Sequence, residues 1–282
     1  MRVLSELVRH PAALIGLIIV GLVVLGAVFA PWLAPFSPDV QLPDGATDDG
    51  MPLPPGARFL LGTDPLGRDL LSRLLFGART SLVIGLVANG IAVGIGLIVG
   101  ISAGYLRGFF GNLLMRFTDL MMAFPALLLA IALAALLKPS LWIVVMVIAM
   151  VNWVQVARIV YTETRGLVER DFITAERSLG AGHGRILILH IMPHLVPTAV
   201  VWGTLGIATT VLLEATLSFL GIGVQPPQAS WGNIINDNQS YFQTSPWLVF
   251  IPGAIILATA LSFNLIGDAL RDILDPTQRG RG

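Results

Sequence analysis

Cysteine is absent from the 282-residue chain, and lysine occurs once, at Lys138. Without thiols the chain can form no disulfide bond, thiolate metal site or thiol nucleophile. A P-loop requires a lysine between a glycine and a serine or threonine, whereas Lys138 precedes Pro139. The chain therefore cannot bind ATP through this motif, and an ATP-driven role would require a separate ATP-binding polypeptide.

Charged residues are also scarce, at 12% of the chain, and the formal net charge is zero. This balance gives no electrostatic basis for a nucleic-acid partner. His190 and His194 have the spacing of two metal ligands on one helix face, but Pro193 lies between them and no third ligand is near. We therefore expect no metal site and no cofactor in this chain. No nucleophile–base pair is apparent either, so we expect no catalytic residue.

Apolar residues are abundant, at 55% of the chain, and the mean hydropathy is +0.81. Both values lie outside the range of soluble domains. Six apolar runs reach the length of about 20 residues that a spanning helix needs; they cover 12–34, 80–105, 113–137, 141–161, 197–219 and 247–268. The sequence therefore predicts an all-α membrane protein with six transmembrane helices. The first run is too long for a signal peptide and is expected to remain as an anchor.

The arginines indicate the orientation of these helices. If the N-terminus is inside, twelve of the 17 basic residues, Arg107, Arg279 and Arg281 among them, fall on the inner side and five on the outer side. The positive-inside rule then places both termini and the loop 162–196 in the cytoplasm. The apolar runs and this orientation together divide the chain into a tail and first helix (1–35), an external segment (36–79) and a five-helix core (80–282).

The external segment contains the run Leu61 to Asp69, which is followed by leucines at helical spacing. Asp64 directly before Pro65 has the pattern of a helix N-cap followed by proline at the first helical position. We therefore expect a helix that starts at Asp64 and lies on the outer membrane surface.

The loop 162–196 is a charged island between two apolar runs. Phe172, Ala175 and Leu179 recur at helical spacing, and Gly180 stands where a helix end favours a left-handed glycine. A second apolar run starts at Ile186. The pattern predicts a short amphipathic helix, a glycine elbow and a second helix that returns to the membrane.

Glu214 is a carboxylate well inside an apolar run, with Ser218 one turn further on. Acidic residues inside a membrane are costly and face protein or water. Two interpretations stay open: the two side chains line a solute pathway, or Glu214 makes a structural hydrogen bond.

Four separated stretches resemble one family. Gly62-Thr-Asp-x-x-Gly-Arg-Asp69, Leu217 to Pro227 with Ser230-Trp231-Gly232, and Leu261 to Asp272 are similar to motifs of the C-type permease subunit of the dipeptide/oligopeptide/nickel family of ABC importers. Gly180 and the stretch 190–193 resemble that family's "EAA" coupling loop, although Thr174-Ala175-Glu176 stands in place of Glu-Ala-Ala.

This resemblance implies a type I ABC-importer permease fold in a bacterial or archaeal inner or plasma membrane. It implies three kinds of protein partner: a second, homologous permease, cytoplasmic subunits that bind ATP and magnesium, and an external substrate-binding protein. It also implies that this chain contacts membrane lipid. It also implies that the 169–185 loop couples to the ATPase; the residues expected to do so are Asp171, Thr174, Ala175, Glu176, Arg177, Leu179, Gly180, Ala181 and Pro193.

The resemblance favours import of di- or oligopeptides, and it leaves open a permease for nickel or another small solute. A rival of a different class is a stand-alone secondary transporter that uses Glu214 as its ion site. The two classes differ in whether the isolated chain moves solute.

Overall fold

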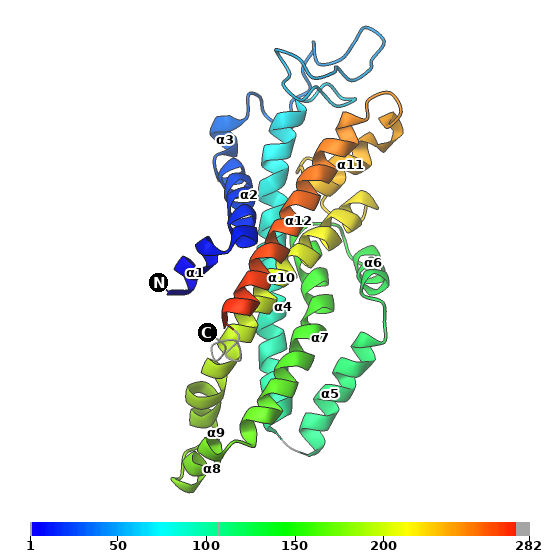
Figure 1. The fold of residues 1–282 in the computed structure, drawn as a ribbon. Coiled ribbons are helices and arrows are strands. Elements are labelled where there is room, and N and C mark those ends of the chain that lie inside the picture. The colour runs from blue at the N-terminus through cyan, green and yellow to red at the C-terminus, as the bar shows by residue number, and fades with distance from the viewer. Residues whose placement is uncertain (1, 107, 275–282) are drawn as a thin grey trace.

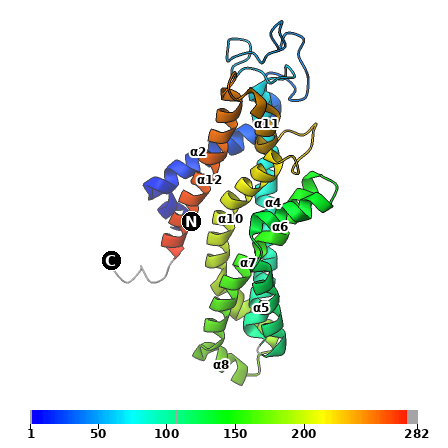
Figure 2. The same cartoon turned by 90° about the vertical axis from the view of Figure 1, so that its right-hand side faces the viewer.

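The computed structural model describes residues 2–106 and 108–274, so Arg107, Arg279 and Arg281 of the orientation argument lie outside the described residues. Within the described ranges the chain is a bundle of helices with an elongated shape (Figure 1). An irregular segment lies at one end of the bundle, and α8 and α9 lie at the other. Figure 2 shows the same separation of the two ends from the side.

The helices follow the apolar runs closely. Their bounds are α1 Arg2–Arg9, α2 Pro11–Val28, α3 Ala30–Leu33, α4 Leu70–Tyr105, α5 Phe109–Met122, α6 Ala126–Leu136, α7 Leu141–Val168, α8 Asp171–Ser178, α9 His183–Arg185, α10 Met192–Phe219, α11 Trp231–Asn238 and α12 Trp247–Leu274. A π-helix η1, Ile186–Ile191, joins α9 to α10, and a 3₁₀ helix η2, Gln239–Tyr241, follows α11. In the described residues five helical stretches are long and apolar enough to cross a membrane, or six if α5 and α6 form one span.

The central pair of helices is α4 and α7, which approach closely because α4 carries glycines on the shared face. A Cβ atom added at Gly96, Gly100 or Gly104 would lie within 2.8 Å of Val156, Val160 or Thr164. Small residues of this kind let membrane helices pack backbone to backbone. These glycines therefore serve packing within the chain, whereas Gly90 and Gly94 face open space.

The prediction of a surface helix that begins at Asp64 is wrong. The helix begins at Leu70, with Asp69 as its N-cap: the Asp69 Oδ2 accepts a hydrogen bond from the Ser72 N–H at 2.7 Å. It then continues without a break to Tyr105, and Leu70 and Leu74 are buried in the core. The reason is that the Asp64 carboxylate accepts the backbone N–H groups of Leu66 and Arg68 in a turn instead of capping a helix.

The third span is broken where the sequence predicted one continuous helix. Its two halves, α5 and α6, are bent by 88°. The bend falls at Pro125, which has no N–H to continue the helix and disfavours helical geometry at Phe124. The fifth span is longer than predicted, because helical structure runs from His183 through η1 to Phe219.

Candidate functional site

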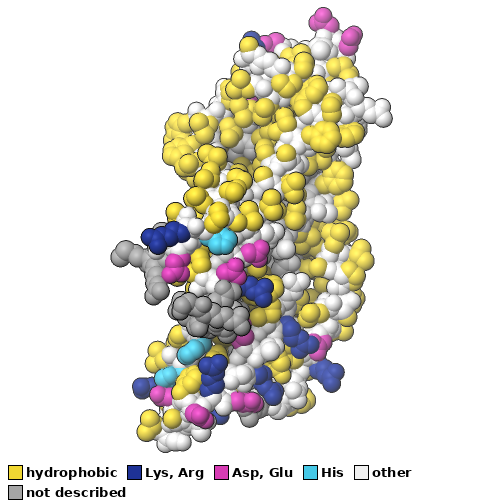
Figure 3. Space-filling view, viewed as in Figure 1, with side chains coloured by type: hydrophobic (Ala, Val, Ile, Leu, Met, Phe, Trp, Pro, Cys, Tyr) yellow, Lys and Arg dark blue, Asp and Glu magenta, His cyan; other side chains and the backbone are white. Residues whose placement is uncertain are grey.

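Two regions at the ends of the bundle contain the 62–69 motif and the predicted coupling residues. We call residues 36–69 together with 220–246 the cap, and residues 169–197 the elbow. Figure 3 shows charged and histidine side chains spread over the half of this face that contains α8, and hydrophobic side chains over most of the other half, with a few charged side chains at its far end. The cap and the elbow lie at opposite ends of the bundle (Figure 1).

The elbow is anchored to the bundle by one residue of α8. Ile173 has no exposed surface and packs in a cluster with Val168, Ile186 and Leu195. The sequence analysis did not select this residue; its β-branched side chain among mostly polar neighbours was the available signal. Of the predicted apolar face, Phe172 stacks on His194, with 5.4 Å between ring centroids. Ala175 is exposed, as is Leu179.

Gly180 ends α8 in the left-handed conformation that the sequence predicted, with φ of +81°. The Gly180 N–H donates to the Arg177 carbonyl at 3.0 Å, and the Ala181 N–H donates to the Glu176 carbonyl at 3.0 Å. This pair of hydrogen bonds is the Schellman pattern, which satisfies carbonyls at a helix end. The backbone therefore turns sharply at Gly180, and a Cβ atom there would meet nothing within 4 Å.

The tip of the elbow exposes an apolar side chain. Leu179 is 82% exposed, and Thr174, Ala175 and Gly180 beside it are exposed too. Asp171 is exposed in the first turn of α8, and Pro193 is exposed near the start of α10. Leu179 is the most exposed large apolar side chain of the elbow.

Polar contacts occur within the elbow, between the elbow and the end of α4, and between α7 and α10 beside it. Glu176 Oε2 lies 3.5 Å from His190 Nε2. The Arg177 guanidinium lies over the Tyr105 ring, 5.5 Å from its centroid, and His183 Nδ1 lies 2.7 Å from the Tyr105 hydroxyl. On α7, both carboxylate oxygens of Glu163 lie within hydrogen-bond distance of the single Thr198 hydroxyl of α10, at 2.7 and 2.9 Å.

The cap contains a buried ion-pair network built on the 62–69 motif. Asp64 Oδ2 accepts a hydrogen bond from Arg68 Nε at 2.7 Å and another from Arg73 Nη1. The same two guanidinium groups reach Asp237 on α11, at 3.4 and 2.9 Å. Asp64 has no exposed surface. The network therefore fixes the irregular segment to both α4 and α11.

Glu214 lies in a second buried polar cluster beneath the cap. Its Oε1 accepts a hydrogen bond from Ser218 and its Oε2 accepts one from Ser81, each at 2.8 Å. The two hydroxyls in turn accept the backbone N–H groups of Val224 and Trp231. Glu214 has no exposed surface and Ser218 has 2%. The geometry favours the structural hydrogen bond over a place on the wall of a pathway.

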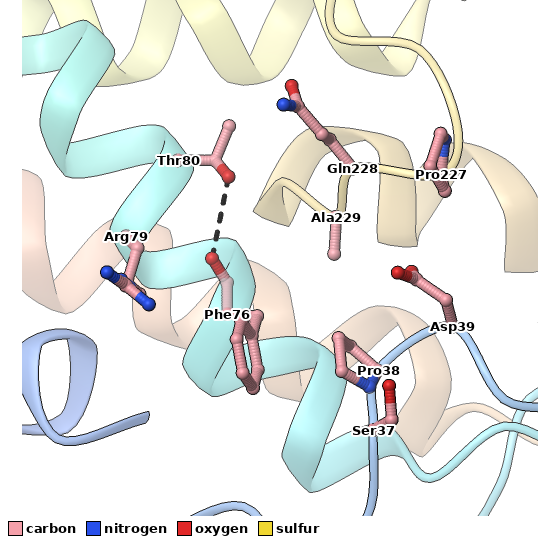
Figure 4. Close-up of a pocket in the computed structure, with 9 residues that line it drawn as sticks. All are labelled: Ser37, Pro38, Asp39, Phe76, Arg79, Thr80, Pro227, Gln228 and Ala229. Carbon is pink, nitrogen blue, oxygen red and sulfur yellow. Dashed lines mark hydrogen bonds between the residues drawn. The ribbon is translucent and has the colours of Figure 1, made fainter. Parts of the chain in front are cut away.

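A shallow hollow of about 390 Å³ lies beside the cap, lined by residues 37–39, one face of α4 and residues 227–229 (Figure 4). Figure 4 shows Phe76 in this hollow, with Thr80 bonded to the Phe76 carbonyl. Among the described residues no group of three or more histidine, aspartate or glutamate side chains could hold a metal ion.

Asp119 of α5 pairs with Arg158 of α7, while the side chain of Arg116, three residues before Asp119, is exposed. The contact joins α5 to α7, so this charge pair links two helices.

Comparisons with known proteins agree with this arrangement. Residues 96–280 match the family model described as "Binding-protein-dependent transport system inner membrane component", and residues 1–55 match "N-terminal TM domain of oligopeptide transport permease C". The di/tripeptide transport system permease DppC of Pseudomonas aeruginosa is 43% identical over 95% of this chain and 89% of its own. The oligopeptide transport system permease OppC of Haemophilus influenzae is 35% identical over 96% and 86%.

Among solved structures, the methionine ABC transporter MetNI in an inward-facing conformation has a chain with a TM-score of 0.58. The match covers 72% of this chain and 96% of that one at 17% identity, so it supports the fold alone. The matched family models and the two permease relatives, together with the helix bundle, define a membrane-embedded permease subunit of an ABC transporter. The chain belongs to the family of inner-membrane components of binding-protein-dependent transport systems.

Proposed function

We propose that this chain forms half of the translocation pathway of an importer for di- or oligopeptides. The two relatives described above are named as di/tripeptide and oligopeptide permeases, and each aligns with nearly the whole chain. The similarity of this chain to these two relatives supports a peptide, and not nickel, as the solute. A second, homologous permease and an external substrate-binding protein complete the assembly.

The elbow is the proposed contact with the ATP-binding subunit. The observation that carries this proposal is the exposed tip around Leu179, which the chain itself leaves uncovered. Gly180 sets the angle of the tip, and Ile173 anchors it to the bundle. Closure of the ATP-binding subunits would push on this tip and rock the bundle. Since the chain lacks a P-loop, ATP and magnesium belong to those partners.

The arginine count further supports a cytoplasmic elbow, with the cap outside and both termini inside. In this orientation the cap would face the substrate-binding protein and the elbow the ATP-binding subunit. Single cysteines at Gly50, Ser240 and Gly182 in the cysteine-free chain test the proposal, because all three positions are exposed. An impermeant thiol reagent added outside should label the first two only. Labelling at Gly182 would reverse the orientation.

Reconstitution tests the function itself. The purified chain in liposomes should neither hydrolyse ATP nor take up a labelled dipeptide until the other permease, the ATP-binding subunits and the substrate-binding protein are added. Nickel uptake by the full complex with no dipeptide uptake would contradict the peptide assignment. Uptake by the isolated chain in an ion gradient, lost in Glu214→Gln, would favour a secondary transporter.

A further inference from the structure

Tyr105 is the last residue of α4, and it contacts the elbow from the side of the bundle. Its side chain is buried, with 6% exposed. The hydroxyl lies 2.7 Å from Nδ1 of His183, and the two rings meet edge to face with centroids 5.6 Å apart. The contact joins residues 78 positions apart in the sequence, so it fixes a membrane helix to the elbow.

The same ring also carries Arg177, whose guanidinium lies 5.5 Å from the ring centroid. A cation over an aromatic face is attracted by the ring's electron density. Arg177 precedes Gly180 on α8, whereas His183 follows it at the start of α9. One tyrosine thus contacts both arms of the elbow, on either side of the glycine turn.

The helix that ends at Tyr105 also carries residues of the cap clusters. Arg73 and Ser81, near the other end of α4, belong to the Asp64 and Glu214 clusters. Between these points α4 is one uninterrupted helix of 36 residues, which is about 54 Å long at 1.5 Å per residue. Its glycine face is packed against α7. A displacement of the elbow must therefore either move α4 or break the Tyr105 contacts.

We propose that Tyr105 is a positioning residue that transmits movement of the elbow to α4, through its hydrogen bond to His183 and its contact with Arg177. The proposal rests on the proposed function, since it presumes that the elbow docks on the ATP-binding subunit. It adds that docking and transmission use different residues. Leu179 and its neighbours form the docking tip, while Tyr105 lies behind the tip and links it to the helix that reaches the cap.

The test is Tyr105→Phe, which removes the hydroxyl and keeps the ring under Arg177. Three quantities are measured in the reconstituted complex: co-purification of the ATP-binding subunits, ATP hydrolysis, and dipeptide uptake per ATP hydrolysed. We expect normal co-purification and a fall of about two- to tenfold in uptake per ATP, the range that one net hydrogen bond supports.

The matched control is Tyr161→Phe on the neighbouring helix α7. The Tyr161 hydroxyl accepts a hydrogen bond from Arg165 of the same helix at 3.4 Å, and that arginine lies 6.0 Å from the ring centroid. This pair resembles the Tyr105 pair but joins no second element. Tyr161→Phe should therefore keep wild-type uptake per ATP.

His183→Ala gives a second route, should Tyr105→Phe insert poorly. It should cause a similar fall, and the double variant should be no worse than either single variant, because all three lack the same hydrogen bond. Wild-type uptake per ATP in Tyr105→Phe, or losses that multiply in the double variant, would overturn the proposal. Release of the ATP-binding subunits would overturn it too, since Tyr105 would then act in docking. If the wild-type complex shows no ATP-dependent uptake, the proposed function itself fails, and this inference fails with it.

Discussion

Asp64 at the cap is completely buried between two arginines, whereas Leu179 at the elbow exposes 82% of its surface. The Asp64 carboxylate of the cap is thus paired within the chain, with Arg68 and Arg73, whose guanidinium groups also reach Asp237. At the tip of the elbow, Leu179 is an apolar side chain that no part of the described residues covers. Burial of a charge network is costly unless each group is paired, whereas an exposed side chain remains available to a partner.

This difference indicates which parts of the subunit are complete in isolation. The cap depends on contacts between residues far apart in this one sequence, so its integrity should be measurable as stability of the purified chain. The exposed tip of the elbow is the proposed contact with a partner, so changes at this tip should leave the isolated chain stable and affect only the assembled transporter. The following predictions test this separation, from the largest expected change in stability to the smallest.

Asp64→Ala should have the largest effect. The change leaves two buried guanidinium groups with only Asp237, and breaking a buried ion pair in this way costs about 3–5 kcal/mol. We expect a large loss of thermal stability of the detergent-purified chain. Asp44→Ala is the control, since Asp44 pairs with Arg58 at an exposed site. It should cost less than about 1 kcal/mol. Equal losses in the two variants would refute a cap stabilised by the buried network.

Ser81→Ala should have the next largest effect. It removes a donor to Glu214 and the acceptor for the Trp231 N–H, so two buried polar groups lose a partner. Such a loss costs about 1–3 kcal/mol. The neighbouring hydroxyl of Thr80 bonds only within its own helix, and Thr80→Ala should stay within about 0.5 kcal/mol. Thermal unfolding in detergent compares the two; a more damaging Thr80→Ala would contradict the role of the Glu214 cluster.

Gly180→Val should affect the activity of the complex and not the stability of the isolated chain. Valine in a left-handed conformation costs about 1–2 kcal/mol, too little to unfold the bundle, and there is open space around Gly180 in the chain. The variant should insert and purify normally yet lose dipeptide uptake and substrate-stimulated ATP hydrolysis. Gly182, with φ of −67°, provides the control: Gly182→Ala should retain most activity. Wild-type uptake in Gly180→Val would remove the coupling role from the elbow.

Ala175→Asp and Thr174→Ala should have the smallest effects on stability, because both side chains are exposed. Each should change the free energy of unfolding by less than about 0.5 kcal/mol. They should differ in the complex: a carboxylate on the docking tip should abolish uptake, whereas Thr174→Ala should be mild, since the chain already departs there from the family's motif. Unchanged uptake in Ala175→Asp would place the interface elsewhere.

Local sequence patterns were sufficient for much of the fold. The length of the apolar runs predicted the membrane helices, and Gly180 was correctly predicted to end α8 in a left-handed conformation. These features depend on residues that are neighbours in the chain. The 88° bend at Pro125 was missed because the apolar composition continues through it, and hydropathy does not report the direction of a helix.

The cap was harder to predict because its contacts are distant in sequence. Asp64 has the pattern of an N-cap, but its carboxylate accepts the N–H groups of a local turn and pairs with Arg73. Arg73 in turn reaches Asp237, 164 positions beyond it in the sequence. Ile173 was missed for a related reason: its burial depends on Ile186 and Leu195 beyond the turn. The elbow residues were identified by resemblance, and the structure adds what two of them contact: Arg177 lies over the Tyr105 ring, and Glu176 lies near His190.

The most direct test of the account is the accessibility of Leu179. A single cysteine at this position in the cysteine-free chain should react rapidly with a soluble thiol reagent when the subunit is alone in detergent. In the complex with the ATP-binding subunits its labelling should be strongly suppressed, while a cysteine at exposed Asp49 in the cap should react equally in both states. Equal labelling of Leu179→Cys with and without the ATP-binding subunits would contradict the account.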